Sequence, residues 1–336
     1  MRLAGRIDRH RFESRLLAGN PLGDPHERDL YVYVPPGYDA GAQRYPLVMA
    51  LPGYGSTNLS MLNYDFFQPN PVERFDRLTR EGRMPPALLV LPDAMNRWGG
   101  SQFIDSAATG RYQSYLADEI VPFVDRHYRT VPVREARAVM GRSSGGFGAL
   151  RLGLDRPEVF AAIGSHAGDS AFEASILPEL TRAAIAYDRA GGLQPFIAAL
   201  EQDRSRVDFT GLMLLAYAAA YAPAPELGLP FCELPIDPRT GELRKEVFAR
   251  FLEHDPLQRA ERDANALRSA TLVYLDAGDR DEHGLQFGAR RLAARLRARS
   301  VDVHHEEFVG GHRGTAHRYD TSWPLLISAC ARAIAG

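Results

Sequence analysis

Six runs of consecutive, mostly apolar residues are spaced along the chain, and polar or glycine-rich residues follow each of them. They lie at residues 29–34, 45–51, 87–91, 136–140, 161–165 and 271–275. A continuous apolar run of this length is typical of a strand that is buried on both faces, as in a parallel sheet covered by helices. The pattern therefore predicts an α/β fold with a mostly parallel central sheet flanked by helices.

Other periodicities complete this sheet and predict the helices that cover it. Residues 5–17 alternate loosely between apolar and polar, which favours an antiparallel edge strand, and residues 302–309 predict a last strand. Apolar residues at three- and four-residue spacing predict amphipathic helices. These helices are expected at residues 113–127, 144–154, 286–299 and 322–334.

The regular alternation of strands and helices stops between residues 172 and 265. Helical patterns at residues 211–221 and 243–253 lie in this segment, with proline-containing stretches after the first and before the second. We therefore expect residues 172–265 to form a helical cap, inserted where it can overhang the carboxyl ends of the strands. The α/β core is then made by residues 1–171 and 266–336.

Aromatic residues of the expected cap are candidates for the wall of a substrate pocket. Tyr217, Tyr221 and Phe231 could line a pocket for an acyl group. Packing inside the cap is the simpler interpretation for all three, so none of them is counted as a site residue.

Composition excludes several classes of function. The 336 residues carry a net charge of −2, which offers no electrostatic reason to bind nucleic acid or an anionic membrane. Lys245 is the sole lysine, so a P-loop lysine is absent and Schiff-base chemistry is disfavoured. No stretch reaches the length of a membrane span, and no H-E-x-x-H or cysteine cluster indicates a metal. We expect a small-molecule substrate, with no cofactor and no metal.

The cysteines and the start of the chain bear on the compartment. Cys232 and Cys330 are far apart and form no C-x-x-C pair, which favours a reducing environment. The first residues lack the apolar segment of a secretory signal. We therefore expect a cytoplasmic protein. The sequence leaves the oligomeric state open, a homo-oligomer included.

The strongest chemical signal lies in residues 138–150, AVMGRSSGGFGAL. A buried strand is followed there by Gly141-Arg142-Ser143-Ser144-Gly145, which fits the G-x-S-x-G pattern of a nucleophile elbow. A serine at the tip of so sharp a turn needs small neighbours on both sides to avoid backbone clashes. Ser143 is the predicted nucleophile, and the alternative is a glycine-rich turn in which Ser143 only caps the helix.

The order nucleophile, acid, base along the chain directs the search for partners of Ser143. His312 follows a late strand and two glycines, so it is the favoured base. His317 is the rival if the loop extends that far, while His304 and His305 lie within the strand and face opposite sides.

Three aspartates follow the strand at residues 271–275. Asp276 lies at the strand end, Asp279 in the turn and Asp281 further along the loop. Each could orient the imidazole and stabilise its cation. Their spacing alone does not choose among them.

Backbone N–H groups near Ser143 are expected to stabilise the oxyanion. One donor is the N–H of Ser144, directly after the nucleophile, and the second comes from the loop after the strand ending at Leu51. Tyr54 fits that second place, because Gly53 and Gly55 leave its backbone free to approach a substrate. The alternative is a plain glycine turn.

Taken together, these motifs resemble the esterase D family of α/β-hydrolases. The resemblance rests on residues 51–55, 91–93, 141–150, 276–282 and 310–312. It implies the α/β-hydrolase fold and a D-x-G-x-x-D motif whose last aspartate is the triad acid, which is Asp281 here. It also implies that residues 99–106 lie near the mouth of the active site. The family includes S-formylglutathione hydrolases and feruloyl and siderophore esterases, and the long insertion departs from its compact members.

The sequence thus predicts a serine carboxylesterase that works through an acyl-enzyme intermediate. Ser143 is the predicted nucleophile, His312 the base, and Asp281 the acid that orients it. An acyltransferase with the same triad is the alternative enzyme. A non-catalytic binding protein on the same fold is the alternative outside enzymes.

Overall fold

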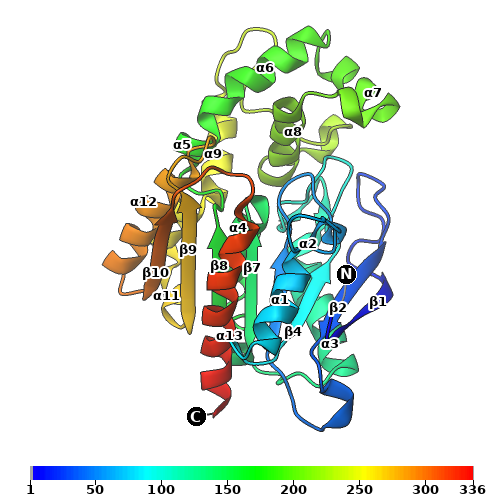
Figure 1. Cartoon of the computed structure of the whole chain (residues 1–336). Helices are drawn as coiled ribbons and strands as arrows, with labels where there is room; N and C mark the ends of the chain where they lie inside the picture. Colours follow the sequence, from blue (N-terminus) through cyan, green and yellow to red (C-terminus); the bar gives the residue numbers. More distant parts are fainter. Residues whose placement is uncertain (1–2, 336) are drawn as a thin grey trace.

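One eight-stranded sheet runs through the protein, which we describe from a computed structural model covering residues 3–335 (Figure 1). The strand order is β1-β2-β4-β3-β7-β8-β9-β10; β2 is antiparallel to both its neighbours, and every other pair is parallel. The strands are β1 (Arg6–Glu13), β2 (Glu27–Val34), β3 (Leu47–Leu51), β4 (Leu88–Pro92), β7 (Arg137–Arg142), β8 (Ala162–His166), β9 (Leu272–Gly278) and β10 (Val303–Phe308). A separate short hairpin contains β5 (Asp105–Ser106) and β6 (Gly110–Arg111).

Helices cover both faces of the sheet, as the sequence predicts. One face carries α1 (Pro71–Arg80) and α13 (Tyr319–Ala335). The other face carries α2 (Tyr112–Ser114), α3 (Val121–His127), α4 (Ser144–Asp155), α10 (Pro256–Arg262), α11 (Ala264–Arg268) and α12 (Leu285–Ala298). A π-helical stretch, Tyr115–Ile120, joins α2 to α3, so the predicted helix at residues 113–127 is continuous.

Side chains of the inner strands alternate between these two helix layers. On β3, Val48 and Ala50 belong to the apolar cluster that contains Trp323 of α13, whereas Leu47 and Met49 belong to the cluster on the α4 side. All four β3 residues are at most 1% exposed. This burial on both faces explains why the inner strands appear in the sequence as continuous apolar runs.

Helix α1 is one element that was not among the helices expected from the sequence. Its start is marked by a capping box, in which the Asn70 side chain accepts the N–H of Glu73 and the Glu73 carboxylate accepts the N–H of Asn70. Pro71 follows at the first helical position, where its missing N–H costs nothing. Val72, Phe75 and Leu78 recur every three residues and are all buried, so the sequence carried an apolar period for this helix as well as its capping residues.

A second group of helices lies beyond one end of the sheet (Figure 1). It comprises α5 (Phe172–Ser175), α6 (Leu180–Arg189), α7 (Leu193–Gln202), α8 (Phe209–Tyr221) and α9 (Lys245–His254). These helices share an apolar cluster of their own, into which Phe147 of α4 also packs. Helices α10 and α11 pack instead against α4, on the sheet side. Across residues 3–335, no helix combines the length and apolarity needed to cross a membrane.

Candidate active site

Ser143 stands at the tip of the turn between β7 and α4, in a strained backbone conformation with φ 56° and ψ −125°. Its N–H donates to the carbonyl of His166 at 2.8 Å, which holds the turn against β8. A Cβ at Gly145 would lie 2.2 Å from the carbonyl oxygen of Leu51, and a Cβ at Gly141 would lie 2.4 Å from Gly145. The glycines of G-x-S-x-G are therefore required by contacts with the backbone.

The structure brings Ser143, His312 and Asp281 into one chain of hydrogen bonds. Nε2 of His312 lies 3.1 Å from Oγ of Ser143, and Nδ1 lies 2.8 Å from Oδ2 of Asp281. The Asp281 side chain is fully buried and that of His312 is 9% exposed. In this arrangement Nδ1–H donates to the carboxylate, which leaves Nε2 free to accept the serine proton.

Two glycines let the loop of Asp281 reach the loop of His312. A Cβ at Gly278, at the end of β9, would lie 2.4 Å from the carbonyl oxygen of Gly310. The two loops are also joined by the N–H of Arg280, which donates to Gly310 O at 2.9 Å. Only a residue without a side chain permits this approach, which sets the distance between acid and base.

The backbone of His312 is held on both sides by charged side chains. Its N–H donates to Oε2 of Glu282 at 2.8 Å, and its carbonyl accepts from Nη1 of Arg142 at 2.9 Å. The N–H of His312 also lowers the pKa of Glu282. Arg142 occupies the first variable position of G-x-S-x-G, so the elbow itself positions the histidine loop. Neither Glu282 nor Arg142 had a predicted role, because their contacts with His312 join segments that are distant in the sequence.

Electrostatics keep Asp281 ionised next to His312. Burial acts to raise the pKa of Asp281, but the hydrogen bond from His312, its charge and the N–H of His283 outweigh burial and lower it. The N–H of His283 donates to Oδ1 of Asp281 at 2.9 Å. Both carboxylate oxygens therefore have a donor, as a buried charge requires.

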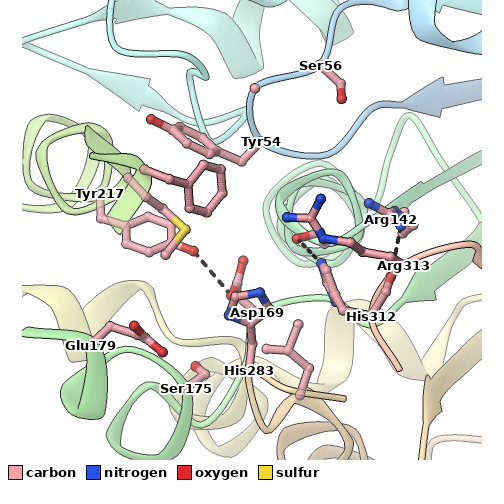
Figure 2. Close-up of a pocket in the computed structure, with 15 residues that line it drawn as sticks. Tyr54, Ser56, Arg142, Asp169, Ser175, Glu179, Tyr217, His283, His312 and Arg313 are labelled. Atoms are coloured by element: carbon pink, nitrogen blue, oxygen red, sulfur yellow. Dashed lines mark hydrogen bonds between the residues drawn. The ribbon is translucent and has the colours of Figure 1, made fainter. Parts of the chain in front are cut away.

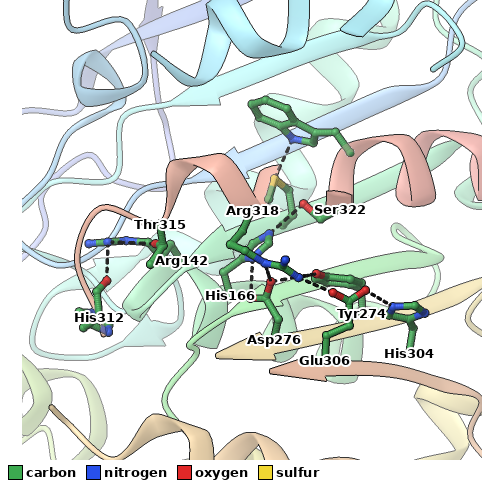
Figure 3. A network of polar contacts seen from close by, with 12 residues as sticks. Arg142, His166, Tyr274, Asp276, His304, Glu306, His312, Thr315, Arg318 and Ser322 are labelled. Atoms are coloured by element: carbon green, nitrogen blue, oxygen red, sulfur yellow. Dashed lines mark hydrogen bonds and ion pairs between the residues drawn. The ribbon is translucent and has the colours of Figure 1, made fainter. Parts of the chain in front are cut away.

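Asp276, the first rival acid, belongs to a different network (Figure 3). Its Oδ1 lies 2.7 Å from Nδ1 of His166, its neighbour across β8 and β9, and its Oδ2 accepts from Arg318 and Tyr274. Nε2 of His166 lies 2.9 Å from Oγ of Ser322. This second Ser-His-Asp set is 3% exposed or less at each residue, so no substrate reaches its serine. It ties α13 to the ends of β8 and β9.

The remaining rivals lie away from Ser143. Asp279 accepts the N–H of Gly310 at 3.0 Å and so serves as a turn carboxylate. His317 is exposed, and its Nδ1 lies 3.2 Å from the carbonyl of Gly314. His304 pairs with Glu306 on β10. Of the candidate acids and bases, the structure places only Asp281 and His312 in contact with each other.

The predicted oxyanion donors come from segments that meet at Ser143. Ser144 begins α4, where the helix N-terminus favours negative charge. A Cβ at Gly53, directly before Tyr54, would lie 3.5 Å from Cβ of Ser143, so the loop after β3 passes beside the nucleophile. The hydroxyl of Tyr54 donates to the carbonyl of Trp98 at 2.7 Å, which anchors its ring.

A cavity of about 350 Å³ opens over the nucleophile, between the sheet and α8 (Figure 2). Ser143 and His312 line it on one side, and Tyr217 of α8 lines it on another. Tyr221, also on α8, packs instead against the rings of Phe147 and Phe172, and Phe231 packs against the same apolar cluster. Of the three aromatic candidates from the cap, Tyr217 is therefore the one that lines the cavity.

Residues 99–106, expected near the mouth of the site, begin against Tyr54. A Cβ at Gly99 would lie 2.9 Å from the Tyr54 hydroxyl oxygen, and the carbonyl of Gly99 accepts the N–H of Gly55 at 2.9 Å. This segment therefore supports the ring that borders the cavity.

Among the described residues, no group of three or more His, Cys, Asp and Glu side chains could hold a metal ion.

Fold and site geometry together define an α/β-hydrolase with a serine at its nucleophile elbow. The chain belongs to the Putative esterase family, whose sequence model matches residues 25–323. This match confirms the resemblance drawn from the motifs.

Individual relatives are more distant. An esterase of Mycobacterium tuberculosis is 24% identical over 160 residues, which make up 47% of this chain and 31% of that protein. The match thus spans about a third of the length of that curated relative.

Solved structures show the shared fold over nearly the whole chain. A ferulic acid esterase superposes with a TM-score of 0.62 at 18% identity, covering 98% of this chain and 100% of its own. An S-formylglutathione hydrolase from Agrobacterium tumefaciens gives a TM-score of 0.62 at 16% identity, covering 99% and 96%.

Proposed function

We propose that the protein hydrolyses carboxylic esters through an acyl-enzyme intermediate. The observation that carries this proposal is the hydrogen-bonded chain from Ser143 through His312 to Asp281, at the wall of a cavity large enough for a small ester. Membership of an esterase family supports the same chemistry.

Each step of the reaction has a group in place. Oγ of Ser143 attacks the ester carbonyl carbon while Nε2 of His312 takes its proton. The bond to the alcohol then breaks, and His312 returns the proton to the leaving alkoxide. Water attacks the acyl-enzyme with His312 again as base, which releases the acid and restores Ser143. Asp281 keeps Nδ1 protonated and stabilises the imidazolium throughout.

The tetrahedral intermediates carry a negative oxygen that needs donors. We assign these to the backbone N–H groups of Ser144 and Tyr54, because their segments meet at Ser143. Loss of one such donor typically lowers the rate by roughly 10²- to 10³-fold. Helices α5 to α9, α8 in particular, act in this proposal as a cap over the substrate.

The test combines covalent labelling with ester hydrolysis. A fluorophosphonate probe should modify Ser143, and Ser143→Ala should abolish both labelling and hydrolysis of p-nitrophenyl butyrate with little change in thermal midpoint. Ser144→Ala is the matched control, since its hydroxyl takes no part in the mechanism. Labelling at Ser144, or hydrolysis that survives in Ser143→Ala, would overturn the assignment.

The two cysteines bear on where this enzyme works. Cys232 and Cys330 are free and buried. Burial raises the pKa of each thiol to about 12. Free thiols support the proposed cytoplasmic location, because oxidising compartments favour disulfides.

A further inference from the structure

The active-site cavity is electrically polarised (Figure 2). Arg142 and Arg313 line it on the His312 side, whereas Asp169 and Glu179 line it on the side of Tyr217. Arg142 already donates to the carbonyl of His312 at 2.9 Å. The mechanism proposed above uses neither carboxylate, so the acidic side needs a separate explanation.

Asp169 is the most unusual of these groups. It is 5% exposed, its Oδ1 accepts the Tyr217 hydroxyl at a long 3.3 Å, and its Oδ2 accepts no hydrogen bond from any described residue. Burial raises its pKa to about 6, although the charge of His312 and the Tyr217 hydroxyl act in the opposite direction. Oδ2 is enclosed by protein atoms, so a cation in the cavity would offset the cost of this buried carboxylate through its charge.

Aromatic rings and a thioether form the wall next to this carboxylate. Tyr54 and Phe209 meet edge to face with ring centroids 5.5 Å apart, and Tyr217 and Met213 continue the wall along α8. Glu179 lies on the same side of the cavity with its side chain 13% exposed, paired with Arg182. A carboxylate beside aromatic faces is the environment that attracts alkylammonium groups, through charge and through the rings.

We propose that this acidic and aromatic side of the cavity is a subsite for an alkylammonium group carried by the ester substrate. The inference rests on the proposed esterase function, because it assigns the substrate class of that same site. Asp169 accepts the ammonium N–H or balances its charge, and the rings of Phe209 and Tyr217 cover the alkyl groups. The protein is then selective for amine-bearing esters over neutral esters of the same shape.

Two pairs of isosteric esters measure this selectivity directly. The first compares 2-(dimethylamino)ethyl butyrate with 3-methylbutyl butyrate, and the second compares ethyl 4-(dimethylamino)butanoate with ethyl 5-methylhexanoate. The amine lies in the alcohol part of the first pair and in the acyl part of the second. For the wild type, kcat/KM should favour the amine by about tenfold or more in at least one pair, as a desolvated cation on aromatic faces implies.

Substitution of Asp169 should remove most of this preference. In Asp169→Asn the ratio of kcat/KM, amine over neutral ester, should fall to within about threefold of one. The ratio is the informative readout, because any effect of Asp169 on His312 changes both esters alike. Phe209→Leu is a second variant on a residue that is 49% exposed, so folding is secure, and it should lower the ratio less.

Glu173→Gln is the matched control. Glu173 is an exposed acid on α5 that does not line the cavity, so this variant changes the net charge equally and should keep the wild-type ratio. A wild type that prefers the neutral ester in both pairs would overturn the subsite. An amine preference that persists in Asp169→Asn and Phe209→Leu would do the same.

Binding to an inactive variant separates the subsite from the esterase proposal. Calorimetry of N,N-dimethylbutylammonium with Ser143→Ala should show binding that weakens at least about fivefold when Asp169→Asn is added. If the wild type hydrolyses none of the esters, the proposed function fails while calorimetry still decides the subsite. Equal binding by both variants, or none by either, refutes the subsite even if neutral esters are hydrolysed.

Discussion

Asparagine at position 281 should nearly abolish catalysis while keeping the shape of the side chain. The Asp281 carboxylate accepts two donors, Nδ1–H of His312 at 2.8 Å and the N–H of His283 at 2.9 Å. Asparagine offers only one acceptor. If its oxygen stays with His283, its NH₂ faces Nδ1 of His312, and the imidazole must carry its proton on Nε2, where it cannot accept from Ser143. In the opposite orientation the amide oxygen accepts from His312, and the amide NH₂ then faces the backbone N–H of His283, so that two donors oppose each other.

The expected loss follows from these contacts. A buried N–H donor without an acceptor costs about 2 kcal/mol, and loss of the charge-assisted hydrogen bond to the imidazolium costs about 3 kcal/mol. The sum of about 5 kcal/mol corresponds to a decrease in kcat between roughly 10³- and 10⁴-fold. The same substitution in the well-studied serine protease triad lowers kcat by about 10⁴-fold.

The assay is hydrolysis of p-nitrophenyl butyrate at neutral pH, with a thermal midpoint for each variant. Asp279→Asn is the control, because Asp279 only accepts a turn N–H, and it should stay within about threefold of wild type. Asp276→Asn should chiefly lower the thermal midpoint, since Asp276 ties α13 to the sheet through His166 and Arg318. A folded Asp281→Asn with a rate near wild type, or a collapse confined to Asp279→Asn, would refute the assignment.

Three further predictions concern positioning and stability. Glu282→Gln keeps the acceptor for the His312 N–H but removes its charge, so kcat should fall about fivefold with KM little changed; a change in KM alone would contradict this. Gly145→Ala forces a Cβ to 2.2 Å from Leu51 O, so the free energy of unfolding in urea should fall by roughly 3 kcal/mol, and an undiminished value would refute the clash. Burial and neighbouring arginines lower the pKa of His254 to about 3. In the unfolded chain the pKa of this histidine is about 6.5, so the unfolded state binds more protons than the folded state below pH 7. The free energy of unfolding should therefore fall by roughly 2 kcal/mol between pH 7 and pH 5. His254→Gln should flatten this pH dependence, and an unchanged slope in the variant would contradict the prediction.

The sequence alone determined those features whose physical cause is local. Inner strands appear as apolar runs because both faces are buried, and the edge strand β1 alternates because one face meets solvent. The elbow is equally local, since Gly141 and Gly145 are required within two residues of Ser143. The order of catalytic residues along the chain also favoured His312, which follows the last strand and two glycines.

Tertiary structure decided what depends on contacts between distant segments. The spacing of Asp276, Asp279 and Asp281 did not choose among them, and only the family resemblance pointed to Asp281. The contact of Asp281 with His312 depends on the approach of Gly278 to Gly310, which lies in a distant loop. His166 meets Asp276 because register pairs β8 with β9, which no spacing in the sequence reveals.

The cavity itself is also a product of tertiary packing. Asp169 follows β8 and Tyr217 lies on α8, so their contact exists only once the cap helices lie over the sheet. Burial then raises the pKa of Asp169, which would stay near its ordinary value in a short exposed peptide. Motifs within a few residues can therefore specify the nucleophile, but the geometry and charge of a pocket depend on which distant side chains the fold brings together.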